Sequence, residues 1–156
     1  IKDIEFCKSI GIDGVVIGAI HEDKSIDITK TKKIVDVARP MKLTFHRAFD
    51  TCLDLENNLE DIIKTGCDYL LTSGQYSDVN KGLENITQLI NISKNRITIL
   101  AGGGVNHKNI HELYAAGVRQ FHLSGIKTDK FGKSETNFHL IKQAVNSFNE
   151  INKKSN

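Results

Sequence analysis

The sequence predicts an α/β protein on the plan of a TIM-type (β/α) barrel, incomplete here, with about five parallel strands alternating with helices. Apolar runs alternate with amphipathic segments along the whole chain. Residues 14–20 form an uninterrupted apolar run, which is typical of strands buried on both faces of a parallel sheet. Helix-to-strand connections are short, and strand-to-helix connections are longer and more polar. An open doubly wound parallel sheet is the alternative, because five strands are too few to close a barrel.

Each element is predicted from apolar spacing and from residues that begin or end helices. The apolar, β-branched and aromatic runs predict strands over residues 14–20, 43–49, 69–72, 97–101 and 120–125. Apolar residues recurring every three or four positions predict helices over residues 2–10, from Asp27 or Thr29 to Pro40, from Asp54 to Gly66, over 79–90, from Asn106 to Gly117, and over 138–148. Residues 127–133 are expected to form a polar loop.

Composition and length limit the organisation and the function. The 156 residues predict a single, partial barrel domain over residues 1–150, followed by a polar tail over 151–156. The net charge of +2 gives no argument for nucleic acid, and no apolar run approaches the roughly 20 residues of a membrane span. Three widely spaced cysteines form neither a disulfide framework nor a zinc motif, so we expect a reducing, cytoplasmic location.

The first residue also carries information about completeness. The chain begins at Ile1, without methionine and inside a predicted helix, which indicates that its front is missing. A sheet of about five strands would then have two open edges. A homo-oligomer, an oligomerising scaffold and an inactive fragment are therefore alternatives for this chain.

The most informative stretch is residues 43–50, where a strand gives way to charged side chains. His46, Arg47 and Asp50 follow Phe45 at the expected strand end. The carboxyl ends of the strands are where (β/α) barrels place their chemistry. We therefore name His46, Arg47, Asp50 and His122 as candidate catalytic residues, with either histidine as acid–base and Asp50 as its partner or as the carboxylate that fixes Arg47. A buried ion pair that only orients a loop is the alternative explanation.

A second candidate site is a pocket for a small anion. A triple glycine follows the strand that would be the seventh of a barrel and runs into a predicted helix. Backbone amides there favour phosphate or carboxylate, and the guanidinium of Arg47 could add donors. Three glycines that merely allow a tight turn are the alternative. The residues expected to bind the ligand are Ser73, Gly102, Gly103, Gly104 and Ser124.

A soft metal site is a further hypothesis for the same rim. Cys52 lies just past a strand end, on the same rim as His46 and His122, and copper(I) favours thiolate and imidazole donors. Simple packing of Cys52 against the following helix is the alternative. His107 and His111 have the i, i+4 spacing of metal ligands, but without a third ligand they are expected to be surface residues.

Five segments of the chain resemble, in order and separation, the signatures of the copper homeostasis protein family CutC. They are residues 14–18, 44–50, 71–74, 102–105 and 121–125, and the resemblance covers about residues 3–148. It implies a TIM-type barrel of which this chain represents strands four to eight, and a role in copper binding or tolerance. The family's proposed ligand cysteines belong to the first two strands, so no metal ligand can be assigned here and copper is implied by resemblance only. The alternative is a barrel enzyme acting on a small anionic or phosphorylated metabolite.

Overall fold

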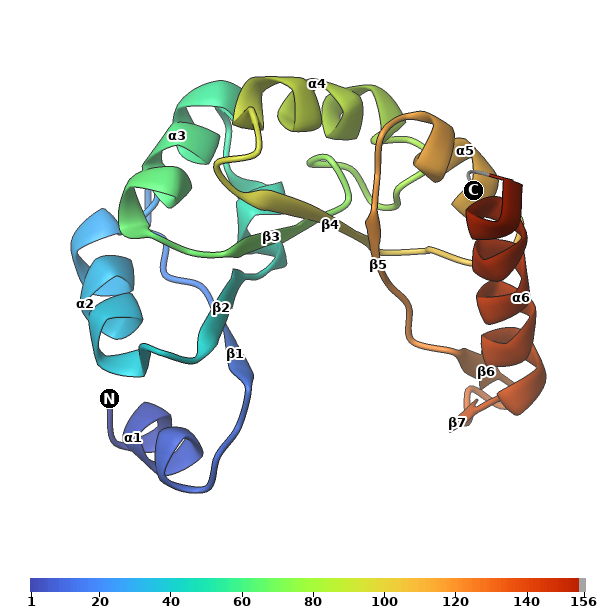
Figure 1. The fold of residues 1–156 in the computed structure, drawn as a ribbon, viewed down its shortest axis with the longest axis horizontal. Helices are drawn as coiled ribbons and strands as arrows, with labels where there is room; N and C mark the ends of the chain where they lie inside the picture. Colours follow the sequence, from blue (N-terminus) through green and yellow to red (C-terminus); the bar gives the residue numbers. More distant parts are fainter. Residues whose placement is uncertain (155–156) are drawn as a thin grey trace.

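The computed structural model describes residues 1–154 and has a parallel five-stranded sheet at its centre (Figure 1). The strands lie side by side in chain order: β1 (Gly14–Ile17), β2 (Lys42–Phe45), β3 (Tyr69–Thr72), β4 (Thr98–Gly102) and β5 (Gln120–His122). The sheet bends into an arc with helices along its convex side (Figure 1). Sequential order with helices on one side is the barrel arrangement, so the doubly wound alternative is not adopted. Within the described residues β1 and β5 do not pair, and the barrel is open.

The helices begin and end largely where their caps predict. They are α1 (Lys2–Ser9), α2 (Ile28–Ala38), α3 (Leu55–Thr65), α4 (Leu83–Ser93), α5 (Ile110–Ala115) and α6 (Phe138–Lys154). The Asp27 carboxylate accepts the Lys30 amide at 2.8 Å, and Asp54 accepts the Asn57 amide at 3.0 Å. No helix among residues 1–154 is both long and apolar enough to cross a bilayer.

Several boundaries differ from the prediction, among them the helix expected over 79–90, which begins at Leu83, and the strand expected over 120–125, which ends at His122. The expected strand over 43–49 ends at Phe45, and η1, a 3-10 helix over Arg47–Thr51, follows because the His46 imidazole accepts the Ala48 amide at 3.1 Å. The helix expected from Asn106 begins only at Ile110, because Asn106 instead accepts the Lys108 amide in a preceding turn. The expected strand over 14–20 ends at Ile17.

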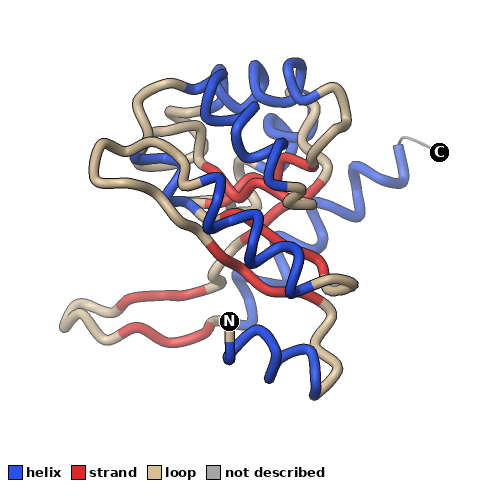
Figure 2. Tube along the Cα trace, turned by 90° about the vertical axis from the view of Figure 1, so that its left-hand side faces the viewer, coloured by secondary structure: helices blue, strands red, loops and turns tan. Residues whose placement is uncertain are grey.

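Residues 126–136 form a β-hairpin, so the polar loop expected over residues 127–133 is confirmed for residues 129–133, whereas Lys127 and Thr128 belong to a strand. The strands β6 (Ile126–Thr128) and β7 (Ser134–Thr136) pair antiparallel. The Asp129 carboxylate closes the turn by accepting the amides of Phe131 and Lys133. The hairpin projects from the body of the molecule (Figure 2).

The C-terminal helix is longer than the apolar spacing predicted. Helix α6 runs to Lys154, and Ile151 is buried, so the helix extends into the segment expected to be a polar tail. Residues 155–156 of that expected tail lie outside the described part of the chain.

The core lies between the sheet and its convex layer of helices. Leu43 and Phe45 of β2 are fully buried there, together with Leu59 and Ile62 of α3. Val16 of β1, in contrast, is 61% exposed, because it alternates onto the concave side, where no further strands close the barrel. The expectation that this run is buried on both faces therefore fails for β1.

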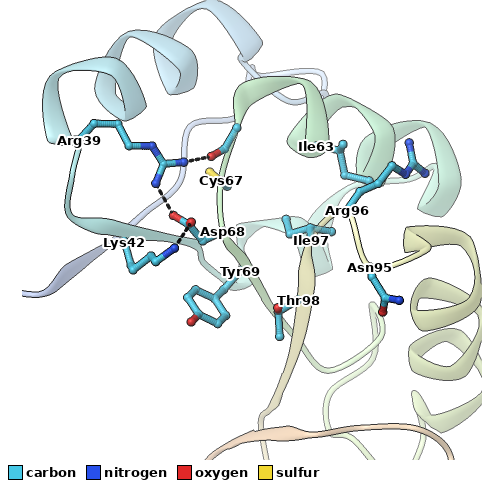
Figure 3. Close-up of a pocket in the computed structure, with 11 residues that line it drawn as sticks. Arg39, Lys42, Ile63, Cys67, Asp68, Tyr69, Asn95, Arg96, Ile97 and Thr98 are labelled. Carbon is cyan, nitrogen blue, oxygen red and sulfur yellow. Dashed lines mark hydrogen bonds and ion pairs between the residues drawn. The ribbon is translucent and has the colours of Figure 1, made fainter.

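The amino ends of the strands are tied together by Asp68 (Figure 3). Its carboxylate binds Arg39 at 2.8 Å and Lys42 at 2.9 Å, and it accepts the Leu43 amide at 2.9 Å. These contacts join the end of α2 to the starts of β2 and β3, beside a cavity of about 310 Å³. In barrels this end of the strands serves stability rather than chemistry.

Stability should depend on the ionisation of Asp68. Partial burial raises the pKa of its carboxyl, but the hydrogen bonds from the Leu43 amide, Lys42 and Arg39 outweigh burial and hold the pKa below its ordinary value of 3.8. A lowered folded-state pKa contributes stability above the unfolded value, and that stability is lost as the pH falls through the folded-state pKa.

We therefore expect the free energy of unfolding of the wild type to fall below about pH 4, as the unfolded carboxyls begin to bind protons. Asp68→Asn should be less stable at neutral pH and should lose less on acidification. Urea unfolding at pH values from neutral to 3 measures how steeply the free energy of unfolding changes with pH in the wild type and in Asp68→Asn. Equal slopes for the wild type and Asp68→Asn would exclude this role for Asp68.

Candidate anion-binding site

Asp50 holds together the cluster of polar groups that follows β2, because its carboxylate accepts hydrogen bonds from several of them. Its side chain is 7% exposed, and one carboxylate oxygen accepts the Arg47 Nε–H at 2.6 Å. The carboxylate also accepts the Thr72 hydroxyl, the Ser73 amide at 3.1 Å and the Gln75 amide at 3.1 Å. Because donors from the protein occupy both oxygens, Asp50 orients Arg47 and attaches the loop after β3 to η1.

Hydrogen bonds fix one side of the Arg47 guanidinium, and the other side has N–H groups available for a ligand. Nη2 donates to the Ser73 hydroxyl at 2.7 Å, while Nη1 donates to no acceptor among residues 1–154. A Cβ built on Gly103 would lie only 2.8 Å from Nη1, so the guanidinium rests directly on the Gly103 backbone. The side chain is 39% exposed. Arg47 thus presents uncommitted N–H groups beside the triple glycine, and a ligand can reach them from solvent.

The glycine loop lies beside Arg47, with Gly103 directly against the guanidinium. Gly103 and Gly104 have φ values of +99° and +84°, which side-chain-bearing residues rarely adopt. Their carbonyls are engaged, Gly103 by the Val79 amide at 2.9 Å and Gly104 by the Asn109 side chain at 3.0 Å. Their amides donate to no acceptor in the described part of the chain.

The two histidines lie at the carboxyl ends of the strands but apart from this cluster. The His46 ring rests on Gly18, next to β1, where a Cβ would come 2.1 Å from its Cε1. Because His46 Nδ1 accepts the Ala48 amide, the neutral ring carries its proton on Nε2. His122 ends β5 and lies beside Gly102. The structure therefore brings together Arg47, Asp50, Ser73 and Gly103, and it brings neither histidine into hydrogen-bond contact with them.

Within residues 1–154 the candidate donors do not form a copper site. The Cys52 side chain is buried and its Sγ donates to the Ala48 carbonyl at 3.7 Å. Burial raises the pKa of the Cys52 thiol, which disfavours the thiolate that a soft metal requires. Within residues 1–154 no group of three or more His, Cys, Asp or Glu side chains is arranged to hold a metal. The proposed trio of Cys52, His46 and His122 is not assembled.

Sequence reasoning did not identify two residues that build the cluster. Thr72 donates its hydroxyl to Asp50, and it accepts the Gly74 amide at 2.8 Å. Gln75 donates its amide to Asp50 and its side chain to the Cys52 carbonyl at 2.9 Å. Thr72 could have been identified from the sequence, because it places a hydroxyl at the end of the apolar strand predicted over residues 69–72. Nothing comparable marked Gln75, because its φ of +64° is visible only in the structure.

Gly103→Ala should remove anion binding because the new Cβ would displace the Arg47 guanidinium. Gly104→Ala is the matched control. It suffers the same type of backbone strain, of about 1–2 kcal/mol, but its Cβ would meet Asp78 at 3.2 Å instead of Arg47. Phosphate titration calorimetry on both variants measures the difference. Equal phosphate affinities for the two variants would contradict the assigned position of Arg47.

The open half of a (β/α) barrel with a donor-lined carboxyl end places the chain in the TIM-barrel class of proteins. The profile of the CutC family matches residues 1–127. The chain belongs to the CutC family. It is 40% identical to a CutC family protein of Bacteroides fragilis over 138 residues, which are 88% of this chain and 55% of that protein. With its Parabacteroides distasonis counterpart it shares 42% identity over 123 residues, 78% of this chain and 51% of the relative.

Solved structures support the same fold. The CutC protein of Streptococcus agalactiae, which is named for copper homeostasis, superposes with a TM-score of 0.73 at 25% identity, covering 78% of this chain and 60% of that one. The thiamine phosphate pyrophosphorylase of Pyrococcus furiosus superposes with a TM-score of 0.65 at 19% identity, covering 95% of this chain and 65% of that chain. The chain spans about half the length of the curated relatives it matches.

Proposed function

We propose that this CutC family chain binds a small oxyanion, phosphate or carboxylate, at the carboxyl ends of β2, β3 and β4. The observation that carries the proposal is the Arg47 guanidinium, fixed by Asp50 and Ser73 while Nη1 stays uncommitted against Gly103. A guanidinium that is already oriented loses little conformational entropy when it binds an anion. Its partial exposure lets the ligand enter without unfolding the loop.

We further propose a role in copper homeostasis, which family membership and the name of the Streptococcus agalactiae relative support. Buried Cys52 and the separated histidines argue against a copper site made by these residues alone. In this account copper handling depends on the longer family protein, and the segment described here contributes the anion site. Acid–base catalysis by His46 is not part of the proposal, because the ring rests on Gly18, away from Arg47.

Calorimetric titration of the chain with inorganic phosphate tests the anion site. Arg47→Met should weaken phosphate binding by about tenfold or more, which corresponds to at least about 1.4 kcal/mol. Arg47→Lys should recover part of the affinity, because it restores the charge without the planar fork. Arg119→Met is the control, since Arg119 stacks on Tyr114 at the other end of β5. Phosphate affinity that is unchanged in Arg47→Met would refute the proposal.

A further inference from the structure

Two uncovered edges flank the open side of the arc. Helix α1 and strand β1 lie at one side of the opening, and the β6–β7 hairpin and the start of α6 lie at the other (Figure 1). We call residues 1–24 the β1 edge and residues 126–145 the hairpin edge. Among the described strands, β1 pairs only with β2, and β5 pairs only with β4. Soluble proteins usually cover or blunt such strand edges, because their backbone groups can pair with another chain.

Exposed large apolar side chains are concentrated at these two edges. Eleven such side chains occur in the described part of the chain, of which five lie on the β1 edge and four on the hairpin edge. Val16 of β1 is 61% exposed, and Phe131, at the tip of the projecting hairpin, is 82% exposed (Figure 2). Scattered apolar residues on a surface need no explanation, but a concentration of this kind marks an interaction surface.

The two edges carry opposite charge. Five acidic residues and three lysines lie on the β1 edge, whereas four lysines and two acidic residues lie on the hairpin edge. All of these charged side chains are exposed. Complementary charge favours the docking of one edge against the other and disfavours the docking of either edge against its own copy. The charged residues are Asp3, Glu5, Asp13, Glu22, Asp23, Lys2, Lys8 and Lys24 on the β1 edge, and Lys127, Lys130, Lys133, Lys142, Asp129 and Glu135 on the hairpin edge.

We propose that a second copy of this chain covers the open side, with the hairpin edge of each copy packed against the β1 edge of the other. Because each copy carries both edges, a two-fold axis forms both contacts at once and closes the assembly as a dimer. A partner with one sign of charge would match only one edge, whereas a second copy matches both. The proposal goes beyond anion binding, and none of its residues belongs to the cluster around Arg47.

Sedimentation velocity of the wild-type chain over a concentration series tests this interface. We expect a dimer. Phe131→Ser and Val16→Ser change one exposed residue on each edge, and each should raise the dissociation constant of the dimer by about tenfold or more, as expected for apolar residues inside an interface. Leu53→Ser is the matched control, because Leu53 is 87% exposed and lies outside both edges. This control should leave the dissociation constant unchanged.

A mixture of the two weakened variants tests which edges meet. In a dimer of one Phe131→Ser chain and one Val16→Ser chain, one of the two contacts contains Phe131 and Val16 together. The equimolar mixture should therefore associate more tightly than either variant alone. Association in the mixture that is no tighter than in the separate variants would overturn the edge-to-edge arrangement.

Two further outcomes would overturn the proposal. One is a wild-type chain that is folded and monomeric throughout the concentration series, which would leave the open side to other parts of the longer family protein. The other is a dimer that Phe131→Ser and Val16→Ser weaken no more than Leu53→Ser does, because the interface would then lie elsewhere on the molecule.

Discussion

Asp50→Ala is expected to lower the free energy of unfolding by about 3 kcal/mol and to abolish phosphate binding. The carboxylate accepts hydrogen bonds from Arg47, Thr72, Ser73 and Gln75, and its removal leaves these donors without their acceptor. Without the carboxylate, Arg47 would also lose its orientation against Gly103. Urea unfolding followed by far-ultraviolet circular dichroism measures the first effect, and phosphate calorimetry the second.

Asp61→Ala is the matched control for this prediction. Asp61 also pairs with a cation three residues away, Lys64 at 2.8 Å, but the Lys64 side chain is 63% exposed. Exposed pairs contribute little, so we expect a loss of less than about 1 kcal/mol and unchanged phosphate affinity. If Asp50→Ala and Asp61→Ala lowered the free energy of unfolding by the same amount, Asp50 would contribute no more to stability than a residue of an exposed ion pair.

Gly82→Ala is expected to destabilise the chain by about 3 kcal/mol for steric reasons alone. Gly82 is the N-terminal cap of α4 and has a φ of −91°, which alanine readily adopts. A Cβ there would lie 1.8 Å from the Ser73 carbonyl oxygen, so the loop after β3 would have to move. Because Ser73 binds both Arg47 and Asp50, phosphate affinity should fall together with stability.

Gly11→Ala provides the contrasting case. Gly11 has a φ of +76° but no neighbour within 4 Å of its Cβ position. Gly11→Ala should lower the free energy of unfolding by about 1 kcal/mol through backbone strain and should leave the phosphate affinity unchanged. If Gly82→Ala proved as stable as the wild type in urea unfolding, the close approach of α4 to the loop after β3 would be wrong.

The sequence predicts the architecture well where local signals and long-range packing agree. Strand β3 has the predicted bounds, and the caps Asp27 and Asp54 act as their side chains suggest. The β6–β7 hairpin was missed because its exposed strands lack an apolar face. The exposure of Val16 could not be foreseen either, because every residue of its run is apolar. Whether Val16 is buried depends on which strands cover the concave side of the sheet, and the sequence around Val16 does not reveal this.

The sequence predicted part of the cluster, the pairing of Arg47 with Asp50, but not the separation of His46 from it. Charged residues at a strand end correctly indicated that Arg47 and Asp50 lie together, and a triple glycine placed its backbone beside them. The pairing with Ser73 depends on β2 and β3 being neighbours, which chain order suggested. Sequence spacing could not separate His46 from the cluster, because the 3-10 turn after β2 sends its ring toward Gly18. The burial of the His107 ring nitrogen depends on the folded chain, which sequence spacing does not reveal.

The most direct test of the central claim is a crystal structure of the chain grown with tungstate, an oxyanion that anomalous scattering locates without ambiguity. We predict an anomalous peak with tungstate oxygens about 3 Å from Arg47 Nη1, alongside the Gly103 backbone. The same peak should vanish in Arg47→Met crystals. An ordered Arg47 with tungstate bound only elsewhere on the molecule would contradict the assignment of this site.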